Sequence, residues 1–341
     1  MRSHVASLIH AALRRLPAAR NVYAQRDALA AVVGQRDDAL HGLRERVRAL
    51  QAEVEATRAA PPPPAEDPLA RFAQWVRDGA FAQVSGHLLT LRNDGLLGAA
   101  GSQLAFPFDG NMFPATVLNG GWQAEELDFL SAHVDPSQTY GLLDIGANIG
   151  LFSRQAARRL PNLGRVVCVE ADPGNFAALN FNLAHLPPPL RALHNIALAD
   201  RAGELTWYRD ANNIGNYSLN ADAMRGQAHH AVTIGAVDAR DFLSGDLGFA
   251  PSQRLIWKSD TQGFDELIIS RAPDPLWDRV DLAVVELWRI AKPAFDRDAF
   301  QRRIGAFANM TIGTHRRVTP QEVMAYLDGD DYAHDDLYLW R

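Results

Sequence analysis

The chain has 341 residues, of which 47% are hydrophobic and 22% charged, as expected for a globular protein with one α/β domain and an appendage. The formal net charge of −6 argues against broad electrostatic binding of nucleic acid. The single cysteine, Cys168, excludes an intrachain disulfide and lies in an apolar run. We therefore expect a buried thiol and a cytoplasmic protein.

The first 26 residues contain arginines but no acidic side chain, and their apolar residues recur at helical spacing. This pattern predicts a basic amphipathic helix, which either packs on a protein surface or rests on an anionic membrane. No apolar stretch in the sequence reaches the roughly 20 residues that a membrane-spanning helix needs. The expected location is therefore the cytoplasm, either free or peripheral to the inner face of the membrane.

Residues 22–54 follow a heptad pattern that only Arg26 and Arg36 interrupt, with charged side chains on the flanks. A narrow apolar stripe of this kind favours paired helices, because it is marginally stable alone in water. We expect a homo-oligomer formed through this segment. The alternative is a single helix that folds back onto the rest of the chain.

A run of prolines at 61–64 ends this helical arm, because each proline ring fixes φ and removes an amide donor. The segment that follows the prolines is interpreted as a lead-in with short helices over 69–79 and 81–91 and an irregular hairpin over 103–113. The resulting division of the chain is an arm at 1–60, a proline-rich linker at 61–67, a lead-in at 68–139 and a main domain at 140–341.

From residue 140 onward, short apolar runs alternate with helical stretches, which predicts βαβ units and a mostly parallel sheet. Two further stretches, 204–209 and 231–237, alternate like an additional pair of strands. The strands expected in the main sheet are 141–145, 165–170, 191–197, 254–259, 282–287, 306–312 and 336–340.

The stretch 142–152 is an apolar strand that breaks into a glycine turn and opens a helix. Gly146 and Gly150 allow the backbone to turn tightly and approach a ligand. The next strand ends at Glu170, an acid that can accept both ribose hydroxyls of an adenosine ligand. Because the glycines are spaced Gly-x-x-x-Gly, a nicotinamide-dependent oxidoreductase is the weaker alternative.

These motifs resemble the FkbM-type S-adenosylmethionine-dependent methyltransferases, which mostly methylate hydroxyls on sugars and natural products. The similarity covers about two thirds of the chain, through segments 120–126, 144–150, 170–173 and 195–200. It implies a Rossmann-like class I methyltransferase fold with a seven-stranded, mostly parallel sheet, and S-adenosylmethionine as cofactor. The residues that it assigns to the cofactor are Asp144, Gly146, Asn148, Gly150, Glu170, Ala171, Asn195 and Ala197.

The stretch 255–265 resembles the family's motif after the fourth strand, so that Lys258, Asp260 and Gly263 carry over. A sugar hydroxyl holds its proton tightly at neutral pH, and a carboxylate within hydrogen-bonding reach helps to remove it. We predict that Asp260 is this catalytic group and that Lys258 orients it or the acceptor.

Two glutamines depart from the family pattern: Gln262 replaces an acid, and Gln123 stands where an acid is common. The Asn-rich segment 212–218 resembles a family segment that faces the substrate, although plain turn chemistry explains it equally well. On this resemblance Asn213, Asn216 and Gln262 are assigned to the acceptor.

Glu286, at the end of the fifth predicted strand, is either a ligand-facing group or a solvated one. The histidines show no spacing typical of a metal site, and no metal is expected.

The predicted function is S-adenosylmethionine-dependent O-methylation of a hydroxyl on a sugar, glycan or natural product. The alternative is an inactive methyltransferase-like scaffold that acts through its coiled coil. Besides the acceptor, the partners expected for the arm are a glycan-assembly enzyme or a membrane surface.

Overall fold

The computed structural model describes residues 81–341 except 93, 120, 225 and 290–291. These residues belong to one compact unit. The predicted arm, linker and first lead-in helix lie outside the described residues, so the coiled coil and the oligomer formed through it stay predictions.

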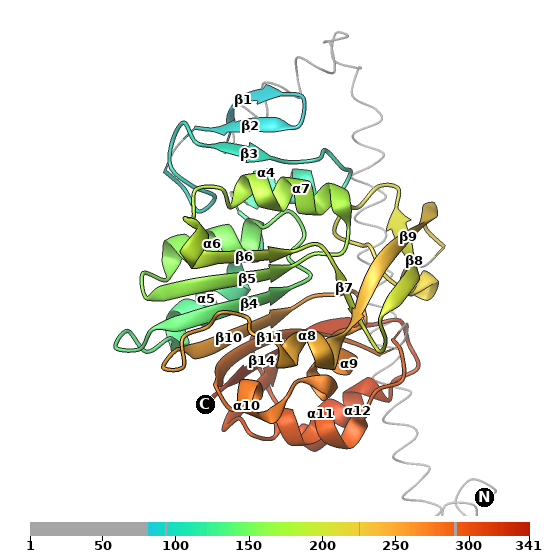
Figure 1. Ribbon diagram of the computed structural model, residues 1–341. Coiled ribbons are helices and arrows are strands. Elements are labelled where there is room, and N and C mark those ends of the chain that lie inside the picture. The colour runs from blue at the N-terminus through green and yellow to red at the C-terminus, as the bar shows by residue number, and fades with distance from the viewer. Residues whose placement is uncertain (1–80, 93, 120, 225, 290–291) are drawn as a thin grey trace, which may run out of the picture. The chain divides into compact units, whose positions relative to one another are not determined.

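The central sheet has eight strands in the order β13-β12-β14-β11-β10-β4-β5-β6 (Figure 1). The strands from β6 to β11 pair in parallel, whereas β14 is antiparallel to both β11 and β12. The strands are β4 (Tyr140–Ile145), β5 (Leu163–Val169), β6 (Arg191–His194), β10 (Arg254–Ser259), β11 (Val280–Trp288), β12 (Asn309–Ile312), β13 (Arg316–Arg317) and β14 (His334–Trp340).

The first strand of this sheet in the chain, β4, lies in its middle, with β5 on one side and β10 on the other. The connections therefore leave β4 and β10 in opposite directions, which makes a topological switch point. In open α/β sheets, ligands bind outside the carboxyl ends of the strands at such a point.

All seven strands expected from the sequence are present, although the one expected at 306–312 begins only at Asn309, and two further details differ. The sheet has an eighth strand, because the two residues of β13 pair with β12. The third predicted strand, 191–197, was too long: β6 ends at His194, and the chain then joins another sheet, where Ala197 pairs with Ala236.

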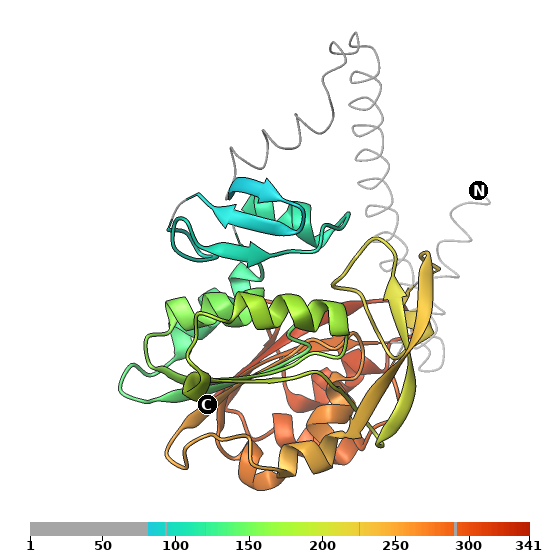
Figure 2. The same ribbon diagram turned by 45° about the horizontal axis from the view of Figure 1, so that its top comes forward.

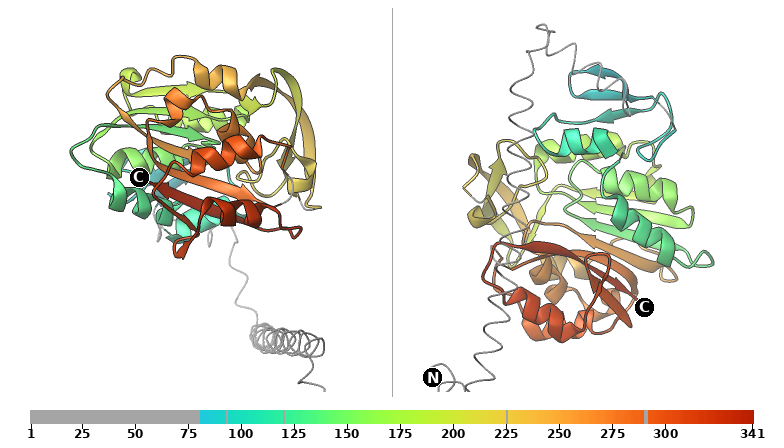
Figure 3. Two further views of the ribbon diagram at one scale, coloured as in Figure 1. Left: turned by 90° about the horizontal axis from the view of Figure 1, so that it is seen from below. Right: turned by 180° about the vertical axis from the view of Figure 1, so that it is seen from behind.

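Helices cover both faces of the sheet (Figure 1 and Figure 3). On one face lie α5 (Ala124–His133), α6 (Leu151–Arg159) and α7 (Pro173–Asn182). On the other lie α8 (Ala239–Ser244), α9 (Asp265–Arg271), α10 (Asp274–Trp277), α11 (Arg297–Ile304) and α12 (Pro320–Leu327). No helix of the described residues is both long and apolar enough to cross a membrane.

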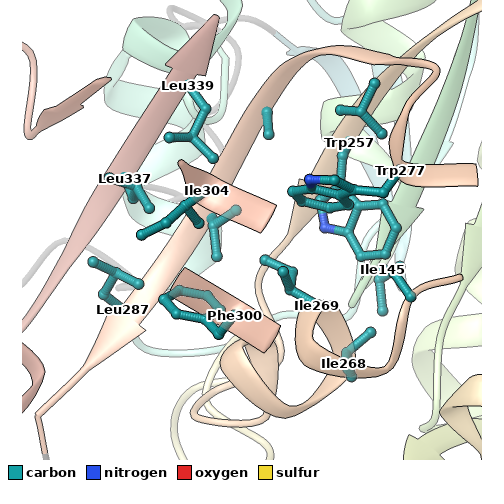
Figure 4. Close-up of a cluster of buried hydrophobic side chains, with 14 of the residues drawn as sticks. Ile145, Trp257, Ile268, Ile269, Trp277, Leu287, Phe300, Ile304, Leu337 and Leu339 are labelled. Carbon is teal, nitrogen blue, oxygen red and sulfur yellow. The ribbon is translucent and has the colours of Figure 1, made fainter. Parts of the chain in front are cut away.

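The strands are buried on both faces because successive side chains point into different layers. On β4, Leu143 and Ile145 pack into the cluster beneath α8 to α12, and Leu142 packs into the cluster beneath α5 and α6. In the larger cluster, the rings of Trp257 and Trp277 meet edge to face with centroids 5.1 Å apart (Figure 4). This packing fixes β10, which carries part of the site described below.

A small sheet of β1 (Phe81–Ser85), β2 (Leu88–Leu91) and β3 (Gln103–Ala105) lies beside α4 (Met112–Asn119) (Figure 2). The helix predicted over 81–91 is therefore wrong, because Gly86, at φ +59°, turns the chain into a hairpin. The hairpin predicted over 103–113 is also wrong. There β3 pairs with β2, and the Asp109 carboxylate then caps the start of α4 by accepting two backbone amides.

A third sheet contains β7 (Ala197–Ala199), β8 (Gly203–Asp210) and β9 (His229–Asp238). The antiparallel ladder of β8 and β9 confirms the additional strand pair expected at 204–209 and 231–237. Figure 2 shows that this sheet projects from one end of the main sheet. Two short 3-10 helices complete the structure: η1 (Pro188–Leu190) and η2 (Ala221–Met224).

Candidate functional site

A pocket lies at the switch point, beyond the carboxyl ends of β4, β5 and β10. Its empty volume, including the part open to solvent, is about 830 Å³. The lining comes from the turn after β4, the ends of β5 and β10, the start of β7, strand β8, and the loops that carry Trp122 and Tyr217. Of the residues assigned to the site from the sequence, those that line the pocket are Gly146, Asn148, Glu170, Ala171, Ala197, Lys258, Asp260 and Gln262.

Gly146 allows the turns after β4 and β10 to approach each other. Its φ is +75°, and a Cβ atom there would lie 1.9 Å from the carbonyl oxygen of Asp260. Any side chain would therefore push the two strand ends apart. Gly150, at φ +79°, has a different role: its Cβ would meet Leu179 of α7 at 2.5 Å, and Gly150 does not line the pocket.

Glu170 follows β5 and is 5% exposed. Its carboxylate accepts the backbone amides of Asn148 and Asp172, both at 2.8 Å. Burial raises the pKa of Glu170 to about 7, although these two amide hydrogen bonds act to lower it. Since a carboxylate offers about four acceptor directions, two remain for a ligand that donates hydroxyl hydrogens.

Three non-glycine residues in the described part of the chain have positive φ: Gln123 (52°), Asn148 (51°) and Gln262 (55°). All three line the pocket, and all three carry side-chain amides. Sparsely populated backbone conformations persist only where the surroundings enforce them, and they cluster at functional sites. Their coincidence here makes this pocket the candidate functional site.

The Asn148 side chain ties the glycine turn to the loop at 212–218. Its Oδ1 accepts the amide of Ile149 at 2.7 Å, and its Nδ2 donates to the carbonyl of Ile214 at 2.8 Å. Asn175 of α7 donates to the same carbonyl at 3.1 Å. The loop therefore forms a fixed wall of the pocket.

Asp260 stands at the end of β10 with its side chain 27% exposed. Its Oδ1 accepts from Nε2 of Gln262 at 2.8 Å, and its Oδ2 accepts from Nε2 of Gln123 at 3.1 Å. Both oxygens are thus held by neutral amides, and free lone-pair directions remain toward the pocket.

Lys258 lies beneath Asp260, and its side chain is only 4% exposed. Its Nζ is 3.4 Å from Oδ1 of Asp144, 3.7 Å from Oδ2 of Asp260 and 3.3 Å from the carbonyl oxygen of Gly146. Burial acts to lower the pKa of Lys258, but the carboxylates of Asp144 and Asp260 outweigh it, and the pKa is raised. Lys258 is therefore a permanent cation that neutralises acids around it.

Several residues assigned to binding from the sequence do not line the pocket, and their side chains hydrogen-bond to neighbouring protein groups. Asp144 is buried under the turn, where it accepts from Ser153 Oγ at 2.6 Å. Asn195 donates to the backbone carbonyls of Glu170 and Ala171. Asn213 accepts the amide of Gly215, and Asn216 donates to Asp210. The assignment of these residues to a ligand stays a prediction.

Of the aromatic lining residues, Trp122 falls in segment 120–126 of the family resemblance, whereas Trp207 was not assigned to the site from the sequence. Trp207 of β8 is 7% exposed, and no hydrogen-bond partner of its indole N–H is found among the described residues. Trp122 is held at both backbone polar groups by Gln155 of α6, at 3.0 and 2.8 Å. The alternation of apolar and polar residues along β8 indicates that Trp207 faces inward, but it does not indicate that Trp207 lines a ligand pocket.

The charged groups that line the pocket are two carboxyls, Glu170 and Asp260, and one cation, Lys258, which is already paired. This lining suits a neutral or cationic ligand. Within the described ranges, no group of three or more histidine, cysteine or acidic side chains is arranged to hold a metal ion.

The fold and the site together define a Rossmann-like α/β domain with a ligand pocket at its switch point. No protein-family model and no curated protein matches the sequence. Among solved structures, one assigned to the methyltransferase yhhF of Escherichia coli is 14% identical over 72% of this chain and 97% of its own, with a TM-score of 0.36.

Two further structures are similar at the same level. One assigned to an O-methyltransferase of Klebsiella pneumoniae is 12% identical over 85% of this chain and 95% of its own, with a TM-score of 0.35. The methyltransferase FkbM of Methylobacillus flagellatus KT is 13% identical over 61% of this chain and 44% of its own, with a TM-score of 0.31. At these values the likeness says nothing about activity, which has to be inferred from the residues of the site.

Proposed function

We propose that this protein is an S-adenosylmethionine-dependent methyltransferase that methylates a hydroxyl group of a sugar, glycan or natural product. The observation that carries the proposal is Glu170. It is buried at the end of β5, bonded to the amide of Asn148 in the glycine turn, and keeps two acceptor directions open. The resemblance to FkbM-type enzymes in the sequence motifs supports the same assignment.

The residues fit an adenosyl sulfonium ligand. Glu170 suits the two ribose hydroxyls, and the neighbouring lining at 196–198 is apolar, as an adenine ring requires. The positive sulfonium matches a lining whose single cation is already paired with acids. When bound, S-adenosylmethionine supplies an electrophilic methyl group.

In this proposal the chain's own residues hold the acceptor and take its proton. Asp260 accepts a hydrogen bond from the acceptor hydroxyl and receives the proton as the oxygen forms its new bond to carbon. Lys258 keeps Asp260 in place from below. The fixed walls at Asn148 and Trp122 exclude water and align the two ligands, which is the larger part of such catalysis.

The inactive scaffold considered from the sequence is not favoured. Both glutamines that replace acids donate to Asp260, and neither fills the pocket. The carboxyl groups that the proposed function needs, those of Glu170 and Asp260, both line the cavity.

The proposal is tested by calorimetric titration of the full-length protein with S-adenosylmethionine. Micromolar binding is expected, weakened at least about tenfold in Glu170→Gln because hydrogen bonds to a charged group are lost. Glu204→Gln, at an exposed position on β8, is the matched control. Transfer of a labelled methyl group to glycan and natural-product extracts then identifies the acceptor. A wild-type protein without donor binding contradicts the proposal.

A further inference from the structure

The backbone at Gln262 is held in an unusual conformation. Its φ of 55° is a left-handed conformation that glutamine rarely adopts. Its backbone carbonyl accepts a hydrogen bond of 2.9 Å from Oγ of Ser218, a fully buried residue of the neighbouring loop. The backbone at Gln262 is therefore held by the surrounding structure, and the direction of its side chain follows from it.

The amide of Gln262 lies between two carboxyl groups from adjacent strands. Nε2 donates to Oδ1 of Asp260 at 2.8 Å and to Oε2 of Glu286 at 3.0 Å. An amide NH₂ has two hydrogens, so both are engaged. We call this contact the amide bridge. On the opposite side, Gln123 donates to Oδ2 of Asp260, so that both oxygens of this carboxyl are held.

The bridge sits in an acidic surrounding. Glu286 is 7% exposed, and burial, with Asp260 and Asp265 adding to it, raises its pKa well above the usual range. The cation nearest to Asp260 is Lys258, which is shared with Asp144. The titratable or charged groups that face Asp260 or Glu286 are Glu126 on α5, Asp144 on β4, Lys258 on β10, Asp265 on α9, and His334 and Asp336 on β14.

We infer that Gln262 is a positioning residue whose amide bridge turns Asp260 toward the pocket and keeps it apart from Glu286. Glu286 does not line the pocket, whereas Asp260 and Gln262 do. Of the neighbouring carboxyl groups, the bridge thus leaves that of Asp260 in position to accept a hydrogen bond from the acceptor hydroxyl. This consequence rests on the proposed function, but the bridge itself is a property of the free protein.

In this protein the amide of Gln262 supplies a neutral donor at this position. A carboxyl group at residue 262 would bring a third acid within hydrogen-bonding distance of Asp260 and Glu286, where the ammonium of Lys258 is already shared with Asp144. At such distances, repulsion between negative charges raises the pKa of at least one of the carboxyl groups, which then stays protonated to a higher pH. A protonated acid can still donate one hydrogen bond, but an ionised one can donate none.

The test is thermal unfolding of the full-length Gln262→Glu variant without ligand at about pH 5.5 and about pH 8. Relative to wild type, its Tm is expected to fall by roughly 5 °C more at the higher pH, because the new carboxyl must ionise beside two others. Gln138→Glu adds the same charge at an exposed position outside the pocket and should follow the wild type. A fall in Tm that is the same at both pH values would show that a charge at residue 262 does not interact with Asp260 and Glu286, and that result overturns the inference.

Gln123→Glu gives a second measurement, since Gln123 contacts Asp260 and is half-exposed at the pocket. The same sign of pH dependence is expected, with a smaller amplitude. If Gln262→Glu does not fold at either pH, Gln262→Met decides, because it removes both hydrogen bonds of the bridge at a similar side-chain size; a Tm and a pH profile equal to those of the wild type then contradict the inference. Binding of S-adenosylhomocysteine to the wild type is measured separately: its absence refutes the proposed function, while the ligand-free comparison still tests the bridge.

Discussion

The backbone amide of Asn148 donates a hydrogen bond of 2.8 Å to the carboxylate of Glu170, 22 positions further along the chain. This bond joins the turn after β4 to the end of β5 before any ligand is present. The ends of two neighbouring strands therefore form one preorganised unit, and little rearrangement is needed when a ligand binds.

Adenosine, which has no group that titrates near neutral pH, should bind more tightly as pH rises. Burial raises the pKa of Glu170 to about 7, and its ionised form is the better acceptor for ribose hydroxyls. Between about pH 5.5 and about pH 8.5 the affinity is expected to increase about tenfold as the ionised fraction grows. Titration calorimetry measures this, and Glu170→Gln should remove the dependence. An affinity that is flat in the wild type contradicts the role of Glu170.

Gly146→Ala should abolish ligand binding and destabilise the protein. The new Cβ would lie 1.9 Å from the carbonyl oxygen of Asp260, at a φ of +75°. The expected cost is about 3 kcal/mol, from backbone displacement and the left-handed conformation together. Gly235→Ala is the control, because nothing lies within 4 Å of the point that its Cβ would occupy and its φ is not positive. Denaturant unfolding should separate the two; equal stabilities would show that the strand ends are free to move apart.

Asp260→Asn should lower the rate of methyl transfer by about 10²- to 10⁴-fold, as expected for the loss of a group that takes the acceptor's proton. Asn keeps a carbonyl oxygen for one of the two glutamine donors, so the fold should be retained. Single-turnover transfer of labelled methyl groups to the acceptor found in extracts measures the effect. Asp241→Asn, at an exposed position of α8, is the control. Full activity of the Asp260 variant would rule out proton removal by this residue.

The free energy of unfolding should decrease with rising pH because of Glu266, which is fully buried on α9. Burial, with Asp265 adding to it, raises the pKa of Glu266 to about 8. Its contribution is therefore present at pH values below the ordinary pKa of glutamate and is lost as pH rises through about 8. Glu266→Gln keeps an oxygen for the amide of Trp288 and should flatten the fall in Tm between about pH 6 and about pH 8.5. Glu125→Gln, at an exposed site, should leave the slope unchanged.

Much of the fold could be predicted because the spacing of apolar residues and the positions of glycines depend only on short stretches of the sequence. The runs before Gly146 and Glu170 are buried strands, and parallel strands end at the same edge of a sheet. The two residues were therefore expected in one site, and both line the pocket.

The remaining features depend on contacts that local patterns do not encode. Gln123 and Asp260 are 137 positions apart, so nothing in the sequence showed that the two unusual glutamines meet on one carboxylate. The helix predicted over 81–91 is wrong because the local pattern of a short apolar stretch does not distinguish a helix from strands. The left-handed conformation of Gly86 and the pairing of β2 with β3 instead stabilise two strands in this stretch.

The most direct test of the proposed donor site is a crystal structure of the protein with S-adenosylhomocysteine. The ribose hydroxyls should donate to the Glu170 carboxylate, with the adenine against Ala171 and Ala197 and the sulfur facing Asp260. An adenosyl group bound elsewhere, or a Glu170 whose free acceptor directions are taken by protein groups in the crystal, would contradict the account.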